Sequence, residues 1–293
     1  MAAGWTTTGS LADSLDDVRS SAVSTREYEG VMPQLVDKQT LPEGIGNSWQ
    51  EIKYAALVAQ AETETEEIDN PQQIADSLLT VTPTMVVVET FITDRVKARI
   101  SKIGLARIGR LGQEAIQRKK DEDGLTLFAT GATTSEPGSG ATMTSGYISS
   151  SKSNISSNVT EPGNPPYRGV LHGFQIHDLY SEATAGVGTY PIPEGLTARV
   201  FAEGFRGMVG GVEIFENGNI TITSSNAIGG VFSMEGIVLV QGRAPRVVSV
   251  RNEKRGGGGE HIYHRDEYAY GERPSAGYGW VYRQTSDATA PTS

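Results

Sequence analysis

One short run near the C-terminus holds the densest set of side chains that could do chemistry. Residues 260–267 read Glu-His-Ile-Tyr-His-Arg-Asp-Glu and bring two imidazoles and three carboxylates together. Zinc enzymes use such ligands. The spacing matches no zinc-enzyme motif, however, and alternation along a strand would place His261 and His264 on opposite faces. We therefore predict a solvated strand or loop without a metal, and keep a metal-dependent hydrolase that uses His261, His264 and Asp266 as a remote alternative.

Three other patterns that could support catalysis are incomplete. The glycines at 256–259 lack the Lys-Ser or Lys-Thr element of a phosphate-binding loop, so they predict a flexible turn. Gly138-Ser-Gly140 has no apolar strand before it, as a nucleophile elbow requires. His177 and Asp178 are adjacent on a predicted helix and point about 100° apart, so neither orients the other. We predict no catalytic residue, no metal and no cofactor, and a protein that is not an enzyme.

The composition sets further limits. The 293 residues carry a formal net charge of −10, and only 37% are hydrophobic, which suggests that some burial happens between chains. The absence of cysteine excludes disulfides and thiolate catalysis. We find neither a secretion signal at Met1 nor a run of about 18 apolar residues, so we expect a protein that is not exported and does not span a membrane.

Two adjoining segments carry opposite charge. The first, from Glu62 to Asp76, is acidic and contains no lysine or arginine. The second is a predicted basic helix from about residue 93 to residue 120. The acidic residues are Glu62, Glu64, Glu66, Glu67, Asp69 and Asp76. The basic residues are Arg95, Lys97, Arg99, Lys102, Arg107, Arg110, Arg118, Lys119 and Lys120. Such a layout suits a loop of one copy that lies across the helix of the next copy.

The predicted elements position these charges. Residues 48–59 alternate in polarity and 78–88 are rich in valine and threonine, so they predict a two-stranded finger around the acidic tract. The basic helix has an apolar stripe within an arc of about 140°, and 121–124 are expected to end it. The other expected elements are helices at 10–19, 144–153 and 173–183, and strands at 168–172, 210–215, 231–234, 236–240 and 246–253.

The order of several segments carries a family resemblance. They are Thr82–Asp94 leading into the helix, Lys120–Leu127 at its end, and later Val170–Leu179, Val209–Asn217 and Gly230–Leu239. Taken in this order, over residues 40 to 285, the sequence resembles the major capsid proteins of tailed bacteriophages, which share the Hong Kong 97 type shell fold.

The resemblance implies an α+β fold in four parts. An N-terminal arm would take residues 1–41, and an extended β-hairpin loop would take 42–88. A peripheral domain with a long spine helix would combine 89–127 with 236–270. An axial domain with the C-terminal tail would combine 128–235 with 271–293.

The resemblance also implies a function. The protein would be a major head protein, a structural protein of the virion that self-assembles into pentamers and hexamers of an icosahedral shell around double-stranded DNA, without sequence-specific binding. Assembly would take place in the host cytoplasm with a separate scaffolding protein and a portal, and a decoration protein remains an open question. An encapsulin-like nanocompartment is the alternative. The predicted contacts between subunits join Glu62, Glu64, Glu66, Glu67 and Asp69 to Arg95, Lys97, Arg99, Lys102, Arg107 and Arg110.

Overall fold

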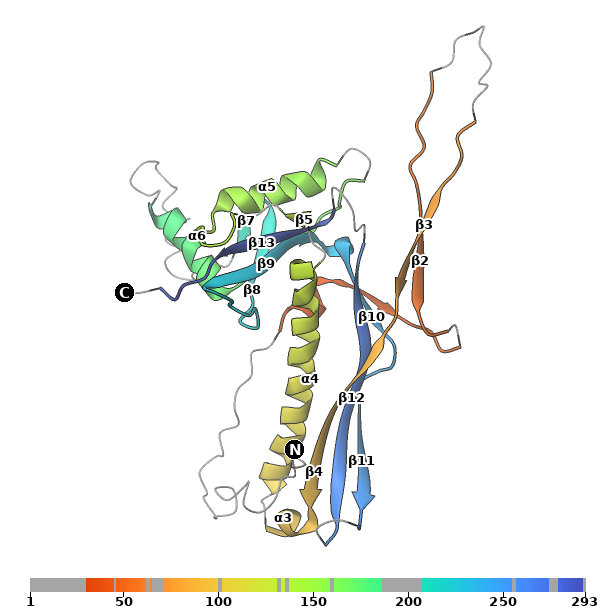
Figure 1. Ribbon diagram of the computed structural model, residues 1–293, viewed down its shortest axis with the longest axis vertical. Coiled ribbons are helices and arrows are strands. Elements are labelled where there is room, and N and C mark those ends of the chain that lie inside the picture. Colours follow the sequence, from red (N-terminus) through yellow and green to blue (C-terminus); the bar gives the residue numbers. More distant parts are fainter. Residues whose placement is uncertain are drawn as a thin grey trace.

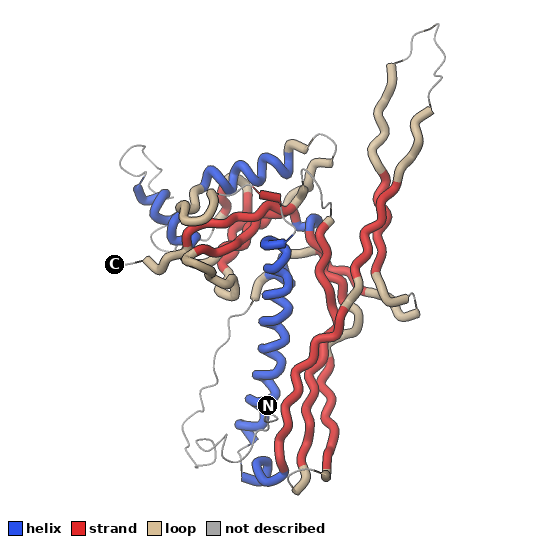
Figure 2. The backbone as a smooth tube through the Cα atoms, in the orientation of Figure 1, coloured by secondary structure: helices blue, strands red, loops and turns tan. Residues whose placement is uncertain are grey.

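A computed structural model shows three parts: a long arm, a compact α/β part beside its upper end, and a hairpin that projects beyond both (Figures 1 and 2). It describes residues 30–44, 46–61, 64, 71–99, 102–130, 133–134, 137–158, 161–185, 207–254, 257–273 and 279–291. The helix predicted at 10–19 lies outside these residues. Each helix in this described part of the chain is too short or too polar to cross a membrane.

The long arm is a five-stranded sheet built around one long strand. Its strands are β1 (Asp37–Thr40), β4 (Thr84–Thr93), β10 (Ile237–Gln241), β11 (Arg246–Asn252) and β12 (Gly259–Glu272). The central strand, β12, pairs antiparallel with β10 and then β11 along one edge and with β4 along the other, while β1 runs parallel to β10. Valine and isoleucine residues supply the buried face of β10.

A long helix packs along this sheet. The short α3 (Asp94–Arg99) follows β4, and α4 (Lys102–Thr130) then runs back beside the arm to the α/β part (Figure 1). His264 of β12 faces α4, since a side chain at Gly112 would lie 2.6 Å from its ring. Because side chains alternate along a strand, every second residue of β12 faces α4.

The prediction that residues 121–124 end the helix is wrong. Asp121 is fully buried, and its carboxylate accepts hydrogen bonds from the backbone N–H of Met32 at 2.9 Å and from the side chain of Asn217 at 2.7 Å. Gly124 leaves room for Met32 and Tyr270, whose atoms lie 3.1 Å from the position of an added side chain. Tertiary contacts therefore continue a helix that local preference would stop.

The α/β part is a six-stranded sheet with two helices. Its strands are β5 (Thr133–Thr134), β6 (Tyr167–Leu171), β7 (Met208–Val209), β8 (Val212–Glu216), β9 (Asn226–Ser233) and β13 (Val281–Asp287). The helices α5 (Ser145–Ser156) and α6 (Gly173–Ala185) confirm the two predicted here. The last turns of α4 reach this core, where Phe128 packs against Phe232 with ring centroids 5.7 Å apart. The short η3 (Met234–Gly236) connects β9 to β10 and so joins the two sheets, and α2 (Met32–Leu35) precedes β1.

The projecting hairpin consists of β2 (Trp49–Tyr54) and β3 (Asp76–Val81). They pair antiparallel, with Trp49 opposite Val81 and Tyr54 opposite Asp76, so the predicted pairing is confirmed. The expectation that the second strand continues to residue 88 is wrong, since residues 84–88 belong to β4 and pair with β12. Pro83 lies between β3 and β4, where its missing N–H interrupts the ladder.

Candidate functional site

The histidines that suggested a metal lie on opposite faces of β12, as strand alternation predicts. The Nδ1 atom of His261 lies 2.6 Å from Oε1 of Glu89, and its Nε2 lies 3.2 Å from the side-chain nitrogen of Asn252. His264 is buried on the other face against α4. Within the described ranges, no three histidine, aspartate or glutamate side chains are placed to hold a metal ion.

Gly257 and Gly258 lie between β11 and β12, and Gly259 begins β12. Gly257 and Gly258 have φ angles of +77° and +97°, which glycine adopts without strain. Carboxylate oxygens of Asp94 and Glu253 lie within 3 Å of the position that a Gly258 side chain would occupy. These negative charges would repel a phosphate, so the turn is not a phosphate-binding loop.

The other histidine and aspartate candidates stabilise local structure. The Nδ1 atom of His172 accepts a hydrogen bond from the backbone of Phe174 at 3.2 Å, and burial lowers the pKa of His172. Asp178 accepts a hydrogen bond from the backbone N–H of Met143 at 3.3 Å, and burial raises the pKa of Asp178. The ring of His172 therefore contacts the start of α6, and the carboxylate of Asp178 contacts the segment before α5.

Two of the six basic residues of the predicted contact already have acidic partners in their own chain. Lys97 pairs with Glu260, and Arg110 lies 3.0 Å from Glu114 one helical turn away. By contrast, Arg95 and Arg99 are exposed and have no ion-pair partner among the described residues. The side chains of Lys102 and Arg107 lie outside the described part of the structure, as do Glu62, Glu66, Glu67 and Asp69.

The hairpin exposes an apolar surface that the molecule itself does not cover. The side chains of Ile52, Tyr54 and Val58 are 56%, 66% and 72% exposed, and Leu57, Ile74 and Leu78 are also exposed. Glu64 is exposed at its tip. A two-stranded ribbon is marginally stable alone, and contiguous exposed apolar groups mark contact surfaces. The hairpin is therefore suited to binding another molecule.

Ionic contacts hold the base of the hairpin to the body. The guanidinium of Arg273 is 2.6 Å from Glu51 of β2 and 2.8 Å from Asp37 of β1, and it donates to the carbonyl of Glu235 at 3.0 Å. Lys53 pairs with Glu161 in the α/β part. These contacts fix the direction in which the hairpin projects, and none of them could be inferred from the sequence pattern.

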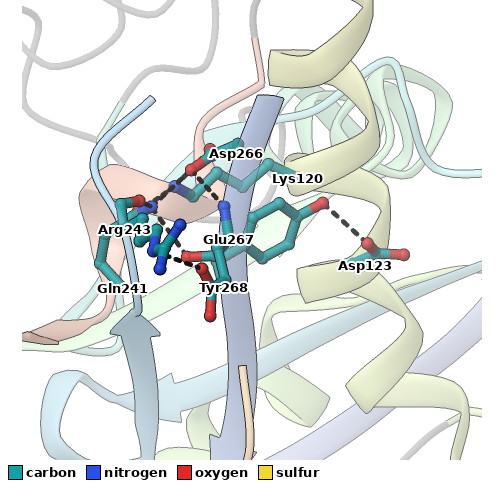
Figure 3. Close-up of polar contacts among 7 residues, drawn as sticks. All are labelled: Lys120, Asp123, Gln241, Arg243, Asp266, Glu267 and Tyr268. Carbon is teal, nitrogen blue, oxygen red and sulfur yellow. Dashed lines mark hydrogen bonds and ion pairs between the residues drawn. The ribbon is translucent and has the colours of Figure 1, made fainter. Parts of the chain in front are cut away.

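A buried polar network fixes the position of α4 on the sheet (Figure 3). The ammonium of Lys120 lies 3.1 Å from Asp266 of β12 and 2.6 Å from the side-chain oxygen of Gln241. The hydroxyl of Tyr268 donates to Asp123 at 2.9 Å, and burial together with this carboxylate raises the pKa of Tyr268 well above its ordinary value. Lys120, one of the basic residues of the predicted helix, is therefore buried within its own subunit.

Glu272 makes the stability of the arm depend on pH. Partial burial raises the pKa of the Glu272 carboxyl from 4.5 to about 7. Between pH 4.5 and pH 7 the unfolded chain therefore binds fewer protons than the folded chain, so stability falls as pH rises through this window. Because solvent still reaches the carboxylate, we expect a loss of only about 1 kcal/mol.

The substitution Glu272→Gln should remove this dependence. Urea unfolding at pH 5 and at pH 8 would measure it, with the exposed Glu43→Gln as the matched control. The interpretation fails if the two variants lose stability equally between these pH values.

Comparison with solved structures identifies the fold. The capsid of the cyanophage P-SCSP1u has a TM-score of 0.71 at 13% identity, covering 97% of this chain and 96% of that one. The capsid of Ralstonia phage GP4 gives 0.70 at 14% identity, with coverages of 94% and 95%. A structure described as Mycobacterium phage Che8 gives 0.71 at 16% identity, with coverages of 90% and 94%. These similarities extend over nearly the whole length of each chain.

No protein-family model matches the sequence, and no curated protein matches it. The similarity is therefore one of fold at low identity. The chain has the α+β Hong Kong 97 type capsid fold, with a long helix and a projecting hairpin, and the expected fold class is confirmed.

Proposed function

We propose that this chain is the major capsid protein of a tailed bacteriophage. It is a non-enzymatic shell subunit that assembles into pentamers and hexamers of an icosahedral head around double-stranded DNA. The observation that carries this proposal is the projecting hairpin, whose apolar side chains have no cover in the subunit, within a fold shared with phage capsid structures over nearly the whole chain. Exposed apolar side chains on a projecting hairpin are typical of a subunit that buries them only in an assembly.

We also propose four parts with the boundaries expected from the sequence: an N-terminal arm at 1–41, an extended loop at 42–88, a peripheral domain at 89–127 and 236–270, and an axial domain with the C-terminal tail at 128–235 and 271–293. Four of these boundaries fall inside elements, because residue 88 lies in β4, residue 127 in α4, residue 235 in η3 and residue 270 in β12. Assembly in the host cytoplasm would use a separate scaffolding protein and a portal, and the finished subunit would reside in the virion.

Contacts between subunits would use opposite charges. The acidic tract at the hairpin tip of one copy would face basic residues of an adjacent copy. Single exposed ion pairs contribute about 0 to 1 kcal/mol, so repetition over many copies supplies the strength. Charge complementarity would also select the orientation of the neighbour.

Charge reversal at the tip tests this contact. The triple substitution Glu64→Lys, Glu66→Lys and Glu67→Lys should leave the subunit folded and strongly reduce the yield of particles, measured by sedimentation and negative-stain imaging. The exposed Glu43→Lys, which lies outside the tip, is the control and should assemble normally. Normal particles from the triple variant would contradict the proposed contact.

The contents of the particles separate two kinds of shell. Nuclease-resistant double-stranded DNA in particles purified from infected cells supports a virus head. Particles that hold an enzyme and no DNA would instead indicate an encapsulin-like compartment.

A further inference from the structure

A shallow groove on the long arm gathers three arginines from neighbouring segments. Arg243 lies in the loop between β10 and β11, Arg246 begins β11, and Arg265 lies on β12. With Met85 of β4 and Glu267 they line the same depression. Because residues of a strand alternate, Arg265 faces away from α4, so the groove opens on the side of the sheet that the helix leaves free.

The positive charge of this arginine groove is largely uncompensated. Arg243 is 3.9 Å from Glu267, at the limit of an ion pair, and the exposed Arg246 has no acidic partner among the described residues. The Nε atom of Arg265 is buried without a hydrogen-bond acceptor, while its guanidinium lies 5.0 Å from the ring of Tyr263.

The nearby carboxylates do not cancel this charge. Asp266 also borders the groove, but it pairs with Lys120 at 3.1 Å on the opposite face of the sheet. One carboxylate, that of Glu267, therefore remains for three guanidinium groups. Guanidinium groups bind carboxylates in paired, charge-assisted hydrogen bonds, so the groove fits a group of carboxylates.

The basic helix offers fewer free charges. Arg110, Arg118 and Lys119 each pair with an acidic residue one turn further along α4, at 3.0, 3.3 and 2.5 Å. An incoming acidic segment would have to displace these partners. In the arginine groove, only the 3.9 Å contact between Arg243 and Glu267 would be exchanged.

The occupant must come from another copy. The groove lies near the base of the hairpin, where β4 leaves it, and the hairpin points away from this region (Figure 1). The strands β2 and β3, which lead to the acidic tract, are thus directed away from the groove of their own copy. A contact from the tip of one copy to the base of the next is head-to-tail, and such contacts close into rings when the rotation permits.

We propose that the arginine groove formed by Arg243, Arg246 and Arg265 binds the carboxylates of residues 62–69 of a second copy. This inference rests on the proposed shell function and names the surface that receives the hairpin tip. The surface that receives the hairpin tip is then the five-stranded sheet, and not the basic helix that the sequence predicts.

A charge swap tests the pairing. The double reversal Arg243→Glu and Arg246→Glu should raise the protein concentration needed for assembly by about tenfold, and adding Glu64→Lys, Glu66→Lys and Glu67→Lys should restore assembly. Both arginines are exposed, so the subunit should stay folded, which circular dichroism would check. The matched control Arg95→Glu with Arg99→Glu should assemble normally and should not rescue the tip variant.

Cross-linking gives a direct readout, because the chain contains no cysteine. Particles with Glu64→Cys and Arg246→Cys should yield a ladder of subunit multimers when treated with a short bis-maleimide. This reagent tolerates a longer separation than a disulfide, which requires Cα atoms within roughly 7 Å. Particles with Glu64→Cys and Arg99→Cys should yield none.

The outcomes separate this inference from the proposed function. Particles that give a ladder only with Arg99→Cys would overturn the groove and support the helix. A third outcome is that no cross-linked ladder forms and that Arg243→Glu with Arg246→Glu lowers only the nucleic-acid content of the particles. That outcome would overturn the inference and indicate that the groove binds phosphate groups. Failure of the wild-type protein to form particles would contradict both proposals.

Discussion

A chain whose hairpin is shortened should fold and form no shells. Replacing residues 56–74 by Asn-Gly would connect Ala55 to Ala75, whose backbone groups already share a hydrogen bond of 2.8 Å. Asn-Gly favours the two-residue turn that fits this pairing. The change removes the exposed Leu57, Val58 and Ile74 together with the acidic tract, and leaves the contacts of Arg273 at the base intact.

Sedimentation of the shortened and the full-length chains would measure the effect, which we expect to be complete loss of large particles. The control is thermal unfolding of unassembled subunits, which should give similar midpoints for both chains. Shells formed in normal yield by the shortened chain would show that the hairpin is not the principal contact between subunits.

The substitution Asp121→Ala should cost about 3 to 5 kcal/mol of unfolding free energy, since it leaves buried donors without an acceptor at about 1 to 3 kcal/mol each. Three groups donate to this carboxylate: the backbone of Met32 at 2.9 Å, Asn217 at 2.7 Å and Asn219 at 2.9 Å. They come from the N-terminal segment and from the α/β part. One buried side chain of α4 therefore joins three regions of the fold.

Urea unfolding in the shortened chain would measure this cost without the added stability of assembly. The control is Glu122→Ala, the next residue of the helix, whose partner is Arg118 at 3.3 Å on the surface. It should cost at most about 1 kcal/mol. Equal losses for the two substitutions would refute the role assigned to Asp121.

Local sequence patterns predicted the elements that depend on local preference. The strand and helix around residues 168–183 have a continuous apolar run followed by helical spacing, and the structure has β6 and α6 there. The alternation at 246–253 likewise corresponds to β11. The resemblance to the capsid fold rested on the order of the segments that contain several of these elements.

Features that depend on distant residues escaped prediction. The helix passes through Asp121 and Gly124 because Met32, Asn217 and Tyr270 surround them, and these partners are about 90 or more residues away in sequence. No window of sequence contains that information.

The contact predicted on the basic helix could be inferred only in part, for the same reason. Charge counts along the sequence correctly marked a basic helix, yet they could not show that Lys97 and Lys120 face Glu260 and Asp266 of the same chain. Arg265 lies far along the sequence from Arg243 and Arg246, and only the pairing of β11 with β12 brings it beside them.

The most direct test of the shell function is an electron micrograph of the purified wild-type protein, expressed alone and together with the other head proteins of its phage. The account predicts closed, hollow particles of megadalton mass, built from rings of five and six subunits. A protein that remains a monomer or small oligomer under both conditions would contradict it.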